Sequence, residues 1–122
     1  MIIKVDLISE VPIYQQIRDQ IVVGIANGKL EPGERLPSVR QLADDLGINH
    51  MTVNKAYTLL KQEGMLVSNR REGTKVAEQP LIELSDDYWQ RLEVILSEGL
   101  SKTKNIKKFR EKILNILKQI GG

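Results

Sequence analysis

The sequence contains no cysteine, one histidine and few aromatic residues, which make up 4% of its 122 positions. Without cysteine it can form neither disulfides nor thiolate metal sites, and this favours a cytoplasmic location. A single histidine cannot assemble a zinc site without further nitrogen or sulfur ligands. We therefore expect no metal and no cofactor.

Long apolar runs are also lacking. No stretch approaches the roughly 18 apolar residues that a membrane-spanning helix needs. Residues 1–12 have no basic segment before their apolar residues and carry Asp6 and Glu10 among them, which argues against a signal peptide. We expect no membrane partner.

An excess of one charge is missing as well, because the net charge is only +2. Residues 1–80 hold ten Lys or Arg and ten Asp or Glu, while residues 81–122 hold eight and six. Bulk charge therefore does not indicate a nucleic-acid-binding protein. Any such function must depend on where individual charges lie.

What the sequence does contain is a supply of aliphatic residues for a core, since 41% of positions are hydrophobic. This is typical of one globular domain with a small appendage.

The first predicted helix spans residues 12–27, because Pro12 suits a first helical position and Gly28 a left-handed C-cap. Its apolar stripe, with spacings of three and four, consists of Tyr14, Ile17, Ile21 and Ile25.

Two shorter helices follow and meet across Gly47-Ile48. Ser38, with Gln41 three residues later, forms a capping box for the first of them. Asn49 is the predicted N-cap of the second, which ends before Gly64. Two capped helices around a short glycine-containing turn are typical of a helix-turn-helix, although ordinary helical bundles contain them too.

A β-hairpin is predicted over residues 65–77, where two β-prone runs flank the polar segment "RREG". Arg70 and Arg71 lie at its tip and Lys75 just beyond, where a wing would meet phosphate. The predicted fold is therefore mainly α with a small β-hairpin wing (α+β), a winged helix-turn-helix.

Pro80 marks a boundary between a DNA-binding domain, residues 1–79, and a helical segment, residues 80–122. Two amphipathic helices in this segment cannot bury both apolar faces alone. We expect them to pack on the front domain or, preferably, on a second copy of the chain. The predicted dimerisation residues are Tyr88, Leu92, Ile95, Leu96, Phe109, Ile113, Ile116, Leu117 and Ile120.

The motifs "PIYQQIRDQI", "LEPGERLPSVRQLADDLG", "MTVNKAYTLLKQEG" and "EGT" occur in this order between residues 10 and 77. In this they closely resemble the N-terminal winged-helix domain of GntR-type bacterial transcription regulators. The short two-helix tail resembles the YtrA branch of that family. The resemblance implies a homodimer that binds a palindromic DNA operator and usually represses transcription, and members of this branch often control transporter operons.

The resemblance also implies DNA contacts from three places: the helix before the turn, the start of the recognition helix and the wing. Carried over by position, and joined by the basic residues of the wing, the candidates are Arg35, Ser38, Arg40, Asn49, His50, Thr52, Asn54, Arg70, Arg71, Gly73 and Lys75.

The sequence departs from the family pattern at two places. Relatives often have Arg at the positions of His50 or Asn54, and the common wing pattern G-x-G-T reads "REGT" here, with Arg71 replacing the first glycine.

Several candidates have a simpler explanation beside the functional one. Asn49 is first of all a cap, with DNA contact as an addition. Arg40 is a base reader or a solvated charge paired with Asp44 four residues on. His50 is a DNA contact or an exposed spectator, since it lacks partners for metal binding or catalysis. Asp44 and Asp45 would repel phosphate and are expected to face away from DNA.

The favoured function is that of a sequence-specific DNA-binding transcriptional regulator. The alternative is a winged-helix protein-interaction module that does not bind DNA, which the net-zero charge of residues 1–80 favours. An enzyme is a distant third, because no nucleophile–base pair or phosphate loop is present. The sequence leaves open the operator, the regulated genes and whether a small-molecule effector exists.

Overall fold

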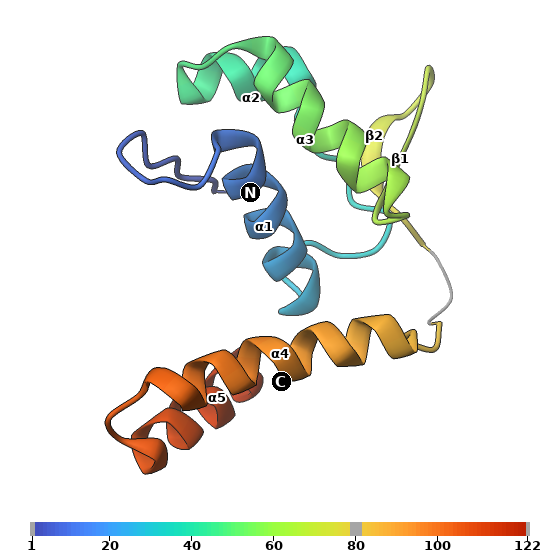
Figure 1. Ribbon diagram of the computed structural model, residues 1–122. Helices are drawn as coiled ribbons and strands as arrows, with labels where there is room; N and C mark the ends of the chain where they lie inside the picture. Colours follow the sequence, from blue (N-terminus) through green and yellow to red (C-terminus); the bar gives the residue numbers. More distant parts are fainter. Residues whose placement is uncertain (1, 79–81, 122) are drawn as a thin grey trace. The chain divides into compact units, whose positions relative to one another are not determined.

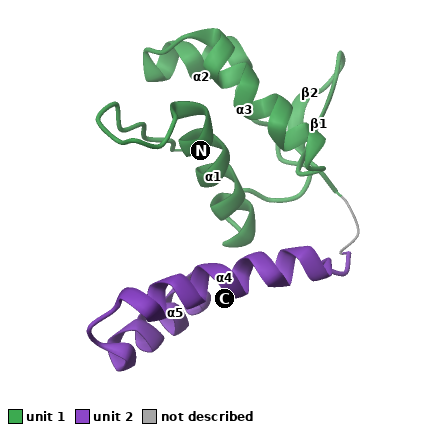
Figure 2. Ribbon diagram, in the orientation of Figure 1, with its two compact units in different colours: residues 1–79 green, residues 80–122 purple. Residues whose placement is uncertain are grey.

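The computed structural model describes residues 2–78 and 82–121. Over these ranges the chain forms five helices and one two-stranded antiparallel sheet (Figure 1). It divides into two compact units, Met1–Gln79 and Pro80–Gly122 (Figure 2). The first unit contains α1 (Ile13–Ala26), α2 (Val39–Leu46), α3 (His50–Gln62), β1 (Leu66–Asn69) and β2 (Gly73–Val76), and the second contains α4 (Asp86–Lys102) and α5 (Ile106–Gly121). The predicted fold class is confirmed.

The helices and the hairpin of the first unit share one hydrophobic core. The faces that the apolar spacing predicts for α1, α2 and α3 are the faces that become buried. The side chains almost wholly enclosed are Ile17, Ile21, Leu42, Ala43, Val53, Ala56, Tyr57, Leu60, Leu66 and Val76.

Tyr57 attaches α3 to the segment that precedes α2. Its ring is fully buried, and its hydroxyl donates a hydrogen bond of 2.7 Å to the carbonyl oxygen of Pro37. Burial raises the pKa of the Tyr57 hydroxyl, so the group remains a neutral donor. The bond fixes the position of the helix-turn-helix relative to the chain that enters it.

Both predicted caps of the helix-turn-helix are confirmed. The Ser38 hydroxyl accepts a hydrogen bond of 3.1 Å from the Gln41 amide, and the Gln41 side chain accepts one of 3.0 Å from the Ser38 amide. Gly47 ends α2 in the left-handed region at φ 67°. Asn49 caps α3 by accepting a hydrogen bond of 2.7 Å from the Met51 amide.

The hairpin of the wing has a further segment of the chain paired beside it. β1 and β2 pair from Leu66↔Val76 to Asn69↔Gly73. Residues 33–36 pair with the other edge of β2, since the Leu36 amide donates to Thr74 at 2.8 Å and the Val76 amide donates to Glu34 at 2.9 Å. The only β-bridge within residues 33–36 is the isolated pair Arg35↔Lys75, so this segment is strand-like and attaches the wing to the rest of the unit.

An extended arm, residues 2–11, lies along α1 and was not anticipated. The Gln20 side chain accepts from the Lys4 amide at 3.1 Å and donates to the Lys4 carbonyl at 2.6 Å. Gln16 makes the same pair of bonds with Asp6, at 2.8 and 2.9 Å. Two glutamines one helical turn apart therefore bind the arm as a neighbouring strand would.

The second unit consists of two helices that pack on one another. α4 begins at Asp86, because Ser85 caps it by accepting from the Tyr88 amide at 3.1 Å. Phe109 of α5 lies directly over Gly99 of α4, where a Cβ would collide with the ring. Over the described residues of both units, no helix has the length and apolar character to cross a membrane.

Candidate nucleic-acid interface

The outward face of α3 is polar and lines an open hollow of about 770 Å³. Of the predicted contacts, Asn49, Thr52 and Asn54 lie along it. Among the residues of the same hollow that the predicted contacts left out are Met51, Lys55 and Thr58. Helical periodicity could have found them, because they lie opposite the buried face of Val53, Ala56, Tyr57 and Leu60.

Lys55 is held in place by an aromatic ring on α1. Its Nζ lies 4.0 Å from the centroid of the Tyr14 ring, a cation–π contact. The ring orients the ammonium group without neutralising it. Lys55 therefore adds a positive charge to the outward face of α3, where an anionic ligand would contact it.

The first turn of α3 carries the positive end of the helix dipole. Asn49 uses its side-chain oxygen for the Met51 amide, so the predicted capping role is confirmed. The Thr52 amide in turn donates to the Asn49 carbonyl at 3.1 Å. With these amides paired inside the chain, the helix dipole is what favours a phosphate group at this end.

His50 has an acidic neighbour on α2. Its Nε2 lies 3.3 Å from Oδ1 of Asp44, and both side chains are at least half exposed. Asp44 thus lies within hydrogen-bonding distance of His50 and, among the described residues, forms no ion pair with Arg40, whose side chain stays exposed. A carboxylate therefore lies at the edge of the candidate interface, although we expected Asp44 to face away from DNA.

The tip of the wing is a three-residue loop, Arg70 to Glu72, that closes on Asn69. The Asn69 side-chain oxygen accepts from the amides of Arg71 and Glu72, at 3.0 and 2.6 Å. Gly73 then adopts φ 74°, a left-handed conformation that favours glycine. The charged side chains of Arg70 and Arg71 are left exposed at the tip.

Lys75 and Glu72 form an ion pair on the wing, with Nζ 2.6 Å from Oε2. Its hydrogen bond and charge raise the pKa of Lys75 and lower the pKa of Glu72. Arg35 is near enough that its charge lowers both pKa values as well. Of the basic residues predicted for the wing, Lys75 is therefore already paired within the chain.

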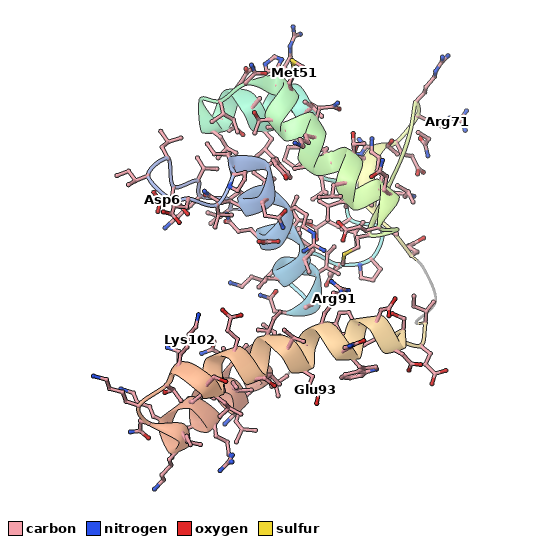
Figure 3. All side chains as sticks on the ribbon, viewed as in Figure 1. Asp6, Met51, Arg71, Arg91, Glu93 and Lys102 are labelled. Atoms are coloured by element: carbon pink, nitrogen blue, oxygen red, sulfur yellow. The ribbon has the colours of Figure 1, made fainter. Side chains whose placement is uncertain are left out.

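The candidate residues lie at two ends of one surface of the first unit. In Figure 3, Met51 at the start of α3 and Arg71 at the tip of the wing both project beyond the same edge of this unit. Ser38 and Arg40 lie at the start of α2, and Arg35 lies on the strand-like segment beside β2. The arrangement offers the N-terminus of a helix at one place and a cationic tip at the other.

The nine residues predicted for dimerisation fall into two groups. Four side chains are exposed: Tyr88, Ile95, Ile116 and Leu117. The other five are half-buried within the second unit: Leu92, Leu96, Phe109, Ile113 and Ile120. Further exposed apolar side chains that the prediction left out are Trp89, Val94, Leu100, Ile106 and Leu114.

Residues 13–76 match the family described as bacterial regulatory proteins, gntR family. The chain is 35% identical over 94 residues to the uncharacterized HTH-type transcriptional regulator YhcF of Bacillus subtilis, covering 77% of this chain and 76% of that protein. It is 42% identical over 76 residues to the HTH-type transcriptional repressor YtrA of Bacillus subtilis, covering 62% of this chain and 58% of the repressor.

Solved structures show the same fold. A transcriptional antiterminator from Listeria monocytogenes EGD-e has a TM-score of 0.86 at 25% identity, covering 100% of this chain and 94% of that one. YtrA from Sulfolobus acidocaldarius, a GntR-family transcription factor, has a TM-score of 0.67 at 43% identity, covering 84% and 100%. AraR(DBD) in complex with operator ORX1 has a TM-score of 0.54 at 30% identity, covering 63% and 95%.

Proposed function

The chain belongs to the gntR family of bacterial regulatory proteins and is YtrA-like, and from this premise we propose that it is a homodimeric repressor that binds a palindromic operator. Its membership makes it a DNA-binding transcriptional regulator. Repression, the dimer and the operator symmetry are our own additions. Control of a transporter operon is a further part of the proposal, because members of the YtrA branch often have that role.

The proposed DNA-binding surface rests on one observation, the presence of two suitable features on the same unit. The start of α3 presents the positive end of the helix dipole beside Asn54 and Lys55, and the wing tip presents Arg70 and Arg71. In the family's docking geometry the recognition helix enters the major groove, while basic loops contact phosphate or the minor groove. We assign α3 to the first role and the wing to the second.

The dimer is supported by the second unit. α4 and α5 are described in full, and no residue of either is buried. A pair of helices with so little enclosed surface is marginal in water. A second copy would cover the exposed apolar residues and place two recognition helices on half-sites about one helical turn apart.

The test is the affinity of the full chain for palindromic DNA from its own promoter region, measured across salt concentrations. We expect the logarithm of the binding constant to fall by about 0.9 for each phosphate contact per log unit of salt. A protein-interaction module that does not bind DNA predicts no binding. Binding that ignores both sequence and salt would also contradict the proposal.

A further inference from the structure

Met51 is a large apolar side chain on the polar outward face of α3. It is 77% exposed and lies in the first turn of the helix. Single exposed apolar residues are common on protein surfaces, so exposure alone means little. Its position matters, because it shares the hollow along α3 with Asn54 and Lys55.

The backbone at Met51 is fixed by the cap. Its amide donates a hydrogen bond of 2.7 Å to the Asn49 side-chain oxygen. Asn54 and Lys55, three and four residues later, lie on the same helical face as Met51. The side chain itself is unbranched and polarizable, which suits contact with a small apolar group at several angles.

The groove that a recognition helix enters carries few apolar groups. Base edges in the major groove present hydrogen-bond donors and acceptors, and the one apolar group is the C5-methyl of thymine. The polar residues around Met51 suit the hydrogen-bond donors and acceptors of the base edges. Asn54 has the donor and acceptor that adenine N7 and N6 require, and Lys55 carries a positive charge for guanine or phosphate.

We propose that Met51 is a specificity-determining residue that contacts the C5-methyl of one thymine in each operator half-site. The inference rests on the proposed function, since it requires α3 to enter the major groove. It predicts a thymine within the reach of the first turn of α3. It also explains why an apolar side chain stands among polar ones at the reading end of the helix.

The test uses the full-length protein and a duplex enriched by it from a random-sequence pool. Each thymine is replaced in turn by deoxyuridine, which removes only the methyl group and keeps base pairing. Loss of one buried methyl should weaken wild-type binding about fourfold per half-site, at one thymine position. Met51→Ala should bind the unmodified duplex more weakly and be indifferent to the methyl at that position, whereas Met51→Leu should keep the dependence.

Val23→Ala is the matched control, because Val23 is also an exposed apolar residue but lies on α1. It should leave both affinity and methyl dependence unchanged. The inference is overturned if no thymine shows a methyl effect, or if Met51→Ala shows the same effect as wild type. If the wild-type protein enriches no duplex at all, the proposed function fails instead, and the two results are distinguishable.

Discussion

At the scale of single residues, acidic side chains stand beside two of the predicted DNA contacts. Asp44 lies 3.3 Å from His50, and Glu72 lies 2.6 Å from Lys75. Glu72 pairs with Lys75, and Asp44 places a carboxylate beside the His50 ring, where it would repel a phosphate. Intramolecular pairing of this kind lowers affinity for DNA of any sequence and leaves more of the binding to base contacts.

Because Lys75 lowers the pKa of Glu72, the ion pair persists at neutral and mildly acidic pH. A lowered carboxyl pKa means that the interaction is fully present above the ordinary glutamate pKa and is lost as the pH falls through the lower, folded-state value. At physiological pH Lys75 is therefore paired unless DNA displaces Glu72. Glu72 therefore limits how readily Lys75 can contact a phosphate.

Glu72→Gln should raise the affinity for DNA a few-fold, because it frees Lys75 to contact phosphate. One additional phosphate contact should steepen the salt dependence by about 0.9 log units per log unit. Titrations at several salt concentrations measure both quantities. Glu10→Gln removes the same charge from the arm and serves as the control. An equal gain in both variants would show that net charge, and not the ion pair, is responsible.

At the scale of elements, the two units differ in how much of their helices they bury. In the first unit, capped helices enclose a continuous core that also takes in the hairpin. In the second, no residue of α4 or α5 is fully buried, and the Phe109 ring lies close to the backbone at Gly99. Glycine within a helix costs about 1 kcal/mol relative to alanine. The close approach of the ring offsets that cost.

Gly99→Ala should destabilise the packing of α4 on α5, although it improves helix propensity. The added methyl would collide with the Phe109 ring, and overpacking costs about 1–3 kcal/mol, which outweighs the propensity gain. Urea unfolding followed by circular dichroism measures the change. Combining the substitution with Phe109→Leu should restore part of the stability. A more stable single variant would refute the proposed role of the glycine.

At the scale of the whole molecule, function depends on placement rather than on bulk charge. Residues 1–80 carry equal numbers of basic and acidic residues. The first unit nevertheless presents the cations Arg70, Arg71 and Lys55 at the surfaces that DNA would contact. The proposed dimer would compensate for this weak charge, because two linked contacts with one DNA site bind far more tightly than a single contact.

Ile116→Glu should therefore convert the proposed dimer to a monomer and weaken operator binding together. Ile116 is 47% exposed on α5, and a charge there would be costly to bury between two copies. Sedimentation velocity measures the oligomeric state. Lys107→Glu, on the same helix, adds an acid without removing an apolar side chain and should leave the dimer intact. A dimer that persists in the Ile116 variant would refute the assigned surface.

Much of the fold was predictable because its determinants are local. Capping by Ser38 and Asn49, the turn at Gly47 and the apolar spacing of α1 to α3 act within a few residues, so the sequence displays them directly. The motifs between residues 10 and 77 likewise indicated the family, which the comparison confirms. The individual DNA contacts and dimerisation residues remain predictions.

Tertiary structure alone decided how distant segments meet. It placed residues 33–36 beside β2, bound the arm to Gln16 and Gln20, and joined Asp44 to His50. It also divided the apolar residues of α4 and α5 between contact with each other and exposure. The sequence specified helix starts, ends and faces, since hydrogen bonds and periodicity within one segment fix them. Which polar groups pair across segments depends on packing that brings their atoms within a few ångströms, and no local pattern encodes it.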